Sequence, residues 1–276
     1  MPRHLFCAPA LALLAAVLSA RAANAAWFSN FNEAGTTVNG YQDDFSGATL
    51  DPAWLEVDVG NNDPNPMFVP SSSMLLMNPA QGDPNKLLYN PATPYNNTNQ
   101  NVLALVRVAR AGSGDGFRGG VSAASAATGA TAGQGFNLHF RNHDPVNPHL
   151  RLLDDARAWG PRTIDAGAGG DTWTAGEWKW LRLVTNGTTV QGKIWEAGTT
   201  PEPAAFDVTW TRGGRTGLAG LATNSLGATG ILEVDYVLIQ AAGLPSIQVV
   251  PEPAAAGLLA LASVALLARS RGAARR

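Results

Sequence analysis

Short segments in which apolar and polar residues alternate recur between residues 101 and 239, and stretches rich in Gly, Pro, Asn and Asp separate them. Alternation with a period of two is typical of a β-strand with one buried face. Nine segments are predicted as strands on this basis: 101–108, 117–123, 135–141, 149–153, 178–185, 189–196, 206–211, 217–223 and 231–239. Because they are short and regularly spaced, and no long amphipathic helix interrupts them, the pattern predicts an all-β, antiparallel β-sandwich.

The last segment, 231–239, gives the clearest assignment of faces. Its even positions are apolar: Leu232, Val234, Tyr236 and Leu238. Glu233 and Asp235 alternate with them and are predicted to lie on the opposite, polar face. The hydrophobic set is therefore expected to face the core.

Segments 178–185 and 189–196 are joined by the strongest turn signal in the chain, Asn186-Gly187. Both residue types tolerate positive φ, which two-residue hairpin loops require. The two segments are predicted to form a β-hairpin.

The N-terminus has the pattern of a signal peptide. Arg3 and His4 precede an apolar stretch, 5–20, and Ala23-Asn24-Ala25 supplies small residues for signal peptidase. Cleavage before Ala26 is expected, so residues 1–25 are assigned to the signal peptide and 26–40 to an N-terminal arm. The only cysteine, Cys7, lies in the signal peptide, which predicts an exported protein without disulfides.

The C-terminal segment 248–276 contains Pro251, Glu252 and Pro253, an apolar run over 254–268, and four arginines. This arrangement resembles the PEP-CTERM sorting tail of Gram-negative bacteria rich in exopolysaccharide. The resemblance implies processing by an exosortase-type enzyme and a final place on the cell surface or in the extracellular matrix. The run is short for a bilayer, about 22 Å as a helix against roughly 30 Å of hydrocarbon, as expected of a temporary inner-membrane anchor. The arginines keep its end cytoplasmic.

Charge argues against nucleic acid as a partner. Six of the 19 Lys and Arg residues lie in the two end segments, whereas all 21 Asp and Glu residues lie between Glu33 and Glu252. Removal of residues 1–25 and of the tail beyond Glu252 therefore leaves 13 basic against 21 acidic residues, a net charge of −8. Nucleic-acid binding rests on a basic surface, so this class is not expected.

Three motifs carry a resemblance within residues 41–247, in this order: Asp-Asp-Phe-Ser-Gly at 43–47, Gly-Glu-Trp at 176–178 and Val-Asp-Tyr-Val at 234–237. Together they resemble the concanavalin A-like, or laminin G-like, jelly roll. The resemblance implies one sandwich domain in an extracellular protein of a class that often binds carbohydrate. That class includes the family 16 glycoside hydrolases and the group related to keto-disaccharide hydrolases.

Glu233 and Asp235 are the candidate catalytic residues, since retaining glycosidases use two carboxylates about 5 Å apart. Family 16 enzymes resemble this segment in placing carboxylates on one strand face as Glu-x-Asp-x-x-Glu. Leu238 occupies the position of the second glutamate and cannot transfer a proton. A solvated or ion-binding strand face is the alternative interpretation, and it is favoured.

Asp43, Asp44 and Asp235 are candidate ligands for a structural calcium ion. They belong to the predicted first and last strands, which are neighbours in many jelly rolls. Carboxylate and carbonyl oxygens are the ligands that calcium prefers.

Polar residues of two adjacent segments form a candidate ligand-binding face. Segment 135–141 alternates apolar residues with Asn137, His139 and Arg141, and the next segment adds His149 and Arg151. Such a face can hydrogen-bond sugar hydroxyls or a carboxylate. A solvated sheet face is the favoured alternative.

Eight tryptophans offer flat apolar rings suited to stacking on sugars. Most are expected in the core, and Trp54 and Trp178 match positions that pack inside similar jelly rolls. Trp159 and Trp173 lie in predicted loops and are the ligand candidates. Covering a sheet edge is the alternative role for both.

Three functional hypotheses follow. The favoured one is an exported, non-catalytic envelope or matrix protein that binds polysaccharide. A carbohydrate-active hydrolase is the second, and a self-associating structural protein is the third.

Overall fold

The nine predicted strands are all confirmed in the computed structural model of the chain, which adds six more among the residues that it describes. These residues are 40–58, 66–72, 74–77, 84–90, 98–110, 118–128, 132–141, 150–154, 163–168, 176–198, 201–211, 214–224 and 231–242. The six strands that this list of nine lacks are β1 (Gly40–Asp43), β2 (Trp54–Asp58), β3 (Phe68–Pro70), β4 (Leu75–Met77), β5 (Pro84–Tyr89) and β10 (Thr163–Ala168). The Asn186-Gly187 hairpin is confirmed, and Gly187 has a φ of +58°.

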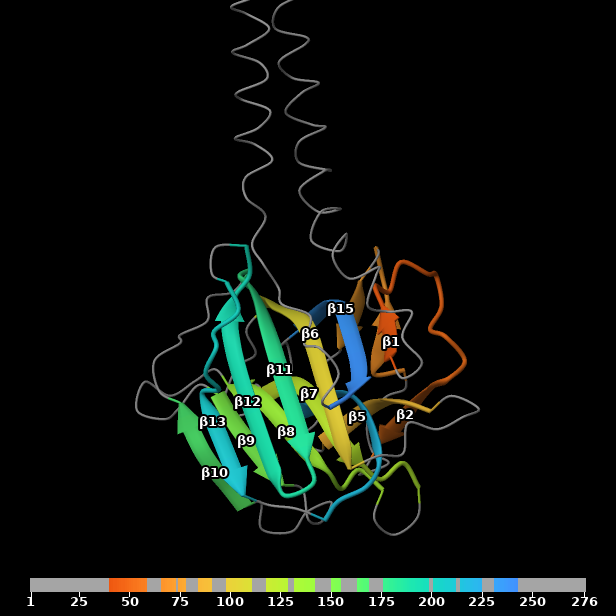
Figure 1. Cartoon of the computed structure of the whole chain (residues 1–276). Coiled ribbons are helices and arrows are strands. Elements are labelled where there is room, and N and C mark those ends of the chain that lie inside the picture. The colour runs from red at the N-terminus through yellow and green to blue at the C-terminus, as the bar shows by residue number, and fades with distance from the viewer. Residues whose placement is uncertain are drawn as a thin grey trace, which may run out of the picture. The chain divides into compact units, whose positions relative to one another are not determined.

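Within these residues the strands form two antiparallel sheets, which Figure 1 shows stacked face to face. The eight-stranded sheet has the order β13 (Val208–Thr211), β12 (Thr189–Glu196), β11 (Trp178–Asn186), β6 (Asn99–Arg110), β15 (Ile231–Ala241), β4 (Leu75–Met77) and β3 (Phe68–Pro70), with β1 (Gly40–Asp43) also paired to β15. The seven-stranded sheet has the order β10 (Thr163–Ala168), β9 (Leu150–Asp154), β8 (Phe136–Arg141), β7 (Arg118–Ser125), β14 (Leu218–Asn224), β5 (Pro84–Tyr89) and β2 (Trp54–Asp58). The predicted antiparallel β-sandwich is confirmed.

Residues Gly35–Ser246 form one compact unit. The predicted signal peptide, most of the predicted arm and the motif of Pro251, Glu252 and Pro253 lie outside the described residues. The described residues contain no helix that is both long and apolar enough to cross a membrane.

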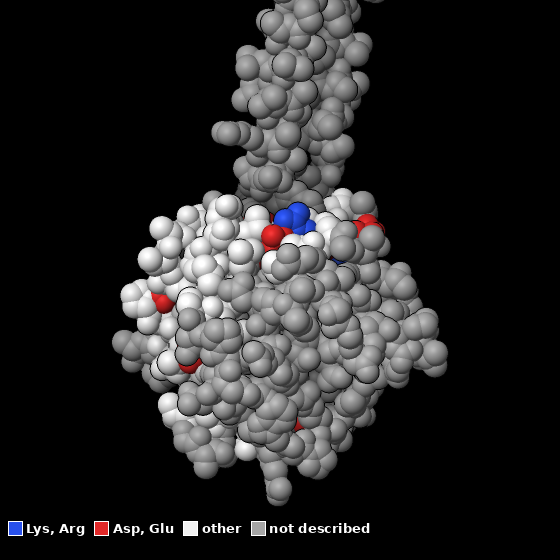
Figure 2. Space-filling model, turned by 180° about the vertical axis from the view of Figure 1, so that it is seen from behind, with Lys and Arg blue, Asp and Glu red and all other residues white. Residues whose placement is uncertain are grey.

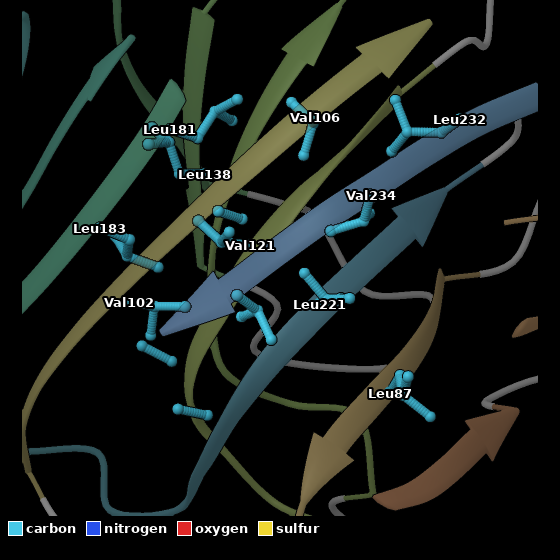
Figure 3. Packing of buried hydrophobic residues seen from close by; sticks show 14 of the residues in the cluster. Leu87, Val102, Val106, Val121, Leu138, Leu181, Leu183, Leu221, Leu232 and Val234 are labelled. Carbon is cyan, nitrogen blue, oxygen red and sulfur yellow. The ribbon is translucent and has the colours of Figure 1, made fainter. Parts of the chain in front are cut away.

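Aliphatic side chains from both sheets meet in the layer between them, as Figure 3 shows. The seven-stranded sheet contributes Leu87, Val121, Leu138 and Leu221, and the eight-stranded sheet contributes Val102, Val106, Leu181, Leu183, Leu232 and Val234. The layer is tight: a Cβ at Gly192 would collide with the side chain of Leu138. Burial of this apolar surface is the main force that holds the sheets together.

A β-bulge in β15 overturns the predicted assignment of its faces. Val234 pairs with Val106, but Tyr236 pairs with Leu105, so Asp235 is an extra residue in the ladder. The alternation therefore changes phase: Val237 and Ile239 join the core between the sheets, whereas Tyr236 and Leu238 lie on the other face. The prediction that 232, 234, 236 and 238 share one face is wrong, because an inserted residue reverses the direction of every side chain after it.

The face of the eight-stranded sheet that points away from the other sheet, here called the outer face, is also largely buried. Leu103, Leu105, Trp180, Tyr236 and Leu238 all lie there, and each is at most 3% exposed. Because both faces of the sheet are buried, the sequence of β6 is a nearly continuous apolar run and does not alternate cleanly.

An ion cluster occupies the same outer face. Arg182 contacts both carboxylate oxygens of Glu202, through Nε at 2.8 Å and Nη2 at 3.0 Å. Lys193 places its Nζ 2.7 Å from the same carboxylate and 2.6 Å from the carbonyl oxygen of Pro203. Burial lowers the pKa of Arg182, and Glu202 opposes that shift. These contacts bind the 201–206 segment to the sheet.

Asp43 connects the first strands of the two sheets. Its Oδ2 accepts hydrogen bonds from Tyr41 Oη at 2.7 Å and from Trp54 Nε1 at 2.8 Å, and its Oδ1 accepts one from Phe45 N at 2.8 Å. Tyr41 also stacks on Tyr89 with centroids 3.5 Å apart. The pKa of Tyr41 is raised, chiefly by burial and also by Asp43. One carboxylate thus orders the rings that join β1 to β2 and β5.

Three of the outermost described strands, β2, β3 and β13, are poor templates for pairing with another chain. At the edges of the eight-stranded sheet, β3 has three residues and includes Pro70, and β13 has four. The edge strand β2 carries Glu56, whose Oε1 accepts a hydrogen bond from Met67 N at 2.8 Å. Short, charged or proline-containing edges disfavour edge-to-edge association.

Described charged residues do not gather into a basic surface in Figure 2. Few charged side chains are visible there, and basic and acidic atoms lie next to one another.

We expect Asp43→Ala to lower the free energy of unfolding by about 3 kcal/mol, because the Tyr41, Trp54 and Phe45 donors lose their acceptor. Urea unfolding followed by tryptophan fluorescence measures this change. Asp51→Ala is the matched control, since the exposed Asp51 accepts one hydrogen bond, from Ala53 N. Equal losses in the two variants would contradict the role given to Asp43.

Candidate functional site

The predicted polar binding face is not a solvent-facing surface where the structure describes it. Asn137 and His139 lie on β8 and are at most 1% exposed. Arg141 and Arg151 belong to β8 and β9, but only their backbones are described. The expectation of a solvated face is therefore wrong for Asn137 and His139. His149, Trp159 and Trp173 lie outside the described residues.

A buried hydroxyl and lysine network lies on the same sheet and was missed from sequence. Lys86 Nζ donates to Ser125 Oγ at 3.0 Å, and Ser122 Oγ lies 2.6 Å from Ser125 Oγ. Serine with lysine can act as a nucleophile and its base. All three side chains are fully buried, and a Cβ at Gly135 or Gly217 would collide with Ser125. This enclosure leaves no room for a substrate, so the network joins β5 to β7 as a structural element.

The first and last strands are neighbours, as the calcium hypothesis required. Asp43 pairs with Val237 of β15. Both oxygens of Asp43, however, accept hydrogen bonds from protein donors, which makes this carboxylate unsuitable as a metal ligand. Among the described residues, no three His, Cys, Asp or Glu side chains are grouped closely enough to hold a metal ion. The set of Asp43, Asp44 and Asp235 therefore does not fit calcium.

The candidate catalytic residues are both placed on β15 but are not equivalent. Glu233 is bound by Arg107, whose Nε donates to Oε2 at 2.6 Å and whose Nη2 contacts the same oxygen. Asp235 is the bulged residue. Leu238, at the position where the family 16 motif has its second glutamate, is fully buried. The described residues thus do not complete the glycosidase motif.

Three neighbouring strands place a tryptophan, an arginine and a glutamate in one row on the outer face. The pairing register sets Trp178 of β11 opposite Arg107 of β6, and Arg107 opposite Glu233 of β15. The Arg107 Cζ lies 4.5 Å from the centre of the Trp178 ring, a cation–π contact. The Arg107 and Glu233 side chains are 28% and 14% exposed, and Trp178 is half-buried. The row is therefore rigid and also open to solvent.

On the β12 side of β11, Ala197 is the backbone neighbour of Trp178: Ala197 N donates to the Trp178 carbonyl oxygen at 3.0 Å. The expectation that Trp178 packs inside the sandwich is wrong, because its register places it on the outer face.

Asp235 extends this row toward the first strand. On the side of β15 away from β6, residues 232–234 pair with β4 and residues 237–240 pair with β1. Asp235 lies between these two partners and interacts electrostatically with Asp44, which follows β1. We call Asp44, Arg107, Trp178, Glu233 and Asp235 the Trp178 patch.

The electrostatics of the patch are dominated by its carboxylates. The pKa of Asp235 is raised from 3.8 to about 6, chiefly by burial and also by Asp44 and Glu233, while Arg107 opposes the shift. Burial and Asp44 also raise the pKa of Tyr236. A carboxyl group that titrates near pH 6 changes the charge of the patch in a mildly acidic medium.

The sequence identified Glu233, Asp235 and Asp44 as candidate residues. It did not predict the contribution of Arg107 to the site or the position of Trp178 on the outer face. Arg107 lies inside a long apolar run, and its charge there was a signal of a position facing solvent. Its partners are 71 and 126 residues away in the chain, and only the strand register brings them together.

The fold is shared with part of a solved structure, a mutant of the GH43 protein BlXynB from Bacillus licheniformis. The TM-score is 0.53 and the sequence identity 13%, and the match covers 72% of this chain and 39% of that one. The chain thus spans about two fifths of the length of that protein. Such a likeness shows the fold alone, and it agrees with the predicted concanavalin A-like jelly roll.

Two further likenesses are weaker. The carbohydrate-binding module CBM66 from Bacillus subtilis has a TM-score of 0.46 and 10% identity, covering 67% of this chain and 94% of that one. The Ca2+-bound form of the VIP36 exoplasmic/lumenal domain has a TM-score of 0.48 and 10% identity, covering 76% and 92%. No protein-family model and no curated protein matches the chain.

The raised pKa of Asp235 makes stability depend on pH. The folded chain keeps a proton that the unfolded chain releases, so this contribution is complete below pH 3.8 and is lost as the pH rises through about 6. We expect Asp235→Asn to be more stable than wild type at pH 7.5 by about 1 kcal/mol, with allowance for its partial exposure, and equally stable at pH 4. Urea unfolding at both pH values measures this difference. A difference independent of pH would contradict it.

Proposed function

We propose that this protein is an exported, non-catalytic component of a Gram-negative envelope or exopolysaccharide matrix that binds carbohydrate through the Trp178 patch. The observation that carries the proposal is the row of Trp178, Arg107 and Glu233 on three paired strands. Sugar rings stack on a flat aromatic face, and fixed charged groups beside it hydrogen-bond the hydroxyls.

Rigidity supports binding at this position. Both Arg107 partners come from strands, and each fixes the guanidinium in a different way: the Glu233 carboxylate through hydrogen bonding and the Trp178 ring through a cation–π contact. Groups that are already ordered lose little conformational entropy when a ligand binds. A sheet surface also suits an extended chain better than a closed pocket does.

A hydrolase on the same fold is the second candidate, and one observation favours it. A carboxyl group with a pKa of about 6, as at Asp235, has the protonation behaviour of a general acid. The engagement of Glu233 by Arg107 argues against a free nucleophile beside it. The third hypothesis, self-association through sheet edges, is disfavoured by the short edge strands.

Export and surface processing rest on the sequence of the two ends. The signal peptide, the Pro-Glu-Pro motif and the terminal arginines support a route through signal peptidase and an exosortase-type enzyme, with transient anchoring in the inner membrane. Calcium stays a prediction without an assigned set of ligands.

We expect the full-length protein to be retained by at least one of a panel of bacterial and plant polysaccharides without release of reducing sugars. Trp178→Ala should weaken retention about tenfold, equivalent to about 1.4 kcal/mol, because the stacking surface is removed. Affinity electrophoresis and a reducing-sugar assay measure the two properties. Trp210→Ala is the matched control, because Trp210 is half-buried on β13 and packs on Phe136 instead.

Each contrary outcome has a clear meaning. Equal weakening by the two variants would remove the Trp178 patch as the binding surface. Sugar products would replace the proposal with the hydrolase, and the absence of any retention would reject carbohydrate binding.

The cell-associated protein should lack residues 269–276, because processing at the tail removes the arginine cluster. Intact-mass spectrometry of the protein from washed cells of a host with an exosortase measures this. A mass that retains all four arginines would count against surface processing.

A further inference from the structure

The Trp178 patch carries more negative than positive charge. Asp44, Glu233 and Asp235 contribute three carboxylates, and Arg107 contributes one guanidinium. Glu177, next to Trp178 in sequence and 41% exposed, adds another carboxylate at its border, 3.9 Å from Lys179. With Lys179 counted, the patch and its border hold four carboxylates and two cations, so their net charge near neutral pH is negative.

Arg107 does not make the patch favourable for an anionic ligand. Its guanidinium is engaged by Glu233 on one side and lies over Trp178 on the other. A carboxylate on a ligand would meet a guanidinium whose charge Glu233 already offsets. It would also approach Asp44 and Asp235, and like charges at short range repel.

A positively charged ligand is attracted by the same carboxylates. An ammonium group can pair with the carboxylates of Asp44 and Asp235 and can also interact with an indole ring, as Arg107 does. Asp44 is exposed and Asp235 is half-buried, so at least one of the two carboxylates can be reached from solvent.

We propose that the Trp178 patch selects polysaccharides that carry free amino groups over those that carry uronic-acid carboxylates. This inference rests on the proposed carbohydrate binding and adds the chemical class of the ligand. The ring supplies the sugar platform, Asp44 and Asp235 supply the charge selection, and the Arg107–Glu233 pair fixes their arrangement.

The test compares three short polymers of matched length at pH 6 and low salt, where the amines of a glucosamine chain are largely protonated: a β-1,4-linked glucosamine chain, the same chain fully N-acetylated, and a polygalacturonate. Microscale thermophoresis with the full-length protein gives the three affinities. We expect the glucosamine polymer to bind at least tenfold more tightly than the polygalacturonate. The preference should weaken at 0.5 M salt, because mobile ions screen exposed charges.

The variant that tests the residues is Asp44→Asn combined with Asp235→Asn. It should weaken binding of the glucosamine polymer about fivefold more than binding of the N-acetylated polymer, as expected for two partly exposed ion pairs. Asp51→Asn is the control: it removes an exposed carboxylate, while its amide oxygen can still accept the hydrogen bond from Ala53 N.

The outcomes separate this inference from the function on which it rests. Binding of the N-acetylated polymer with no preference between the charged polymers would overturn the charge selection and leave carbohydrate binding intact. Tighter binding of polygalacturonate, or an unchanged preference in the double variant, would also overturn the charge selection and leave carbohydrate binding intact. Failure of every polymer here and in the wider panel would overturn both.

Discussion

The extra residue in β15, Asp235, determines which side chains of this strand face the core and which lie on the outer face. Before it, Leu232 and Val234 fill the layer between the sheets, and after it Tyr236 turns to the outer face. The same residue lies where the edge partner of β15 changes from β4 to β1. A bulge normally bends a strand and redirects side chains, and here it also projects a carboxylate toward Asp44. The architecture and the candidate site thus depend on one irregularity in the ladder.

Burial on both faces of the eight-stranded sheet has a consequence for its charged residues. Arg182 and Lys193 lie on a face from which water is largely excluded, and they share the Glu202 carboxylate. Separating one partner would leave a buried charge without compensation, which costs far more than an exposed ion pair contributes. Arg107 is on the same face, but its pair with Glu233 is only partly buried. The same face thus holds a buried ion cluster that stabilises the structure and, at another position, an ion pair that a ligand can reach.

The sequence was informative about strands and much less so about faces. Alternation and the Asn-Gly turn located nine strands, while β3 and β4, with three residues each, are too short to show a period. The bulge at Asp235 is invisible to a pattern that assumes strict alternation. Asn137 and His139 were expected in solvent because polar residues usually lie there, but they are buried. Trp178 and Arg107 could not be paired from sequence, because register between distant strands is a tertiary property.

The arrangement of the two β15 carboxylates favours a binding role over turnover. A retaining mechanism needs one carboxylate free to attack and another able to give up a proton. Glu233 is held by a guanidinium, which stabilises its charge and lowers its nucleophilicity, and the buried Leu238 occupies the position of the missing partner. Asp235 alone retains acid character. A preorganised arginine and carboxylate pair beside a half-buried indole serves to orient a ligand, and the same contacts that fix this pair remove the free carboxylate that catalysis would require.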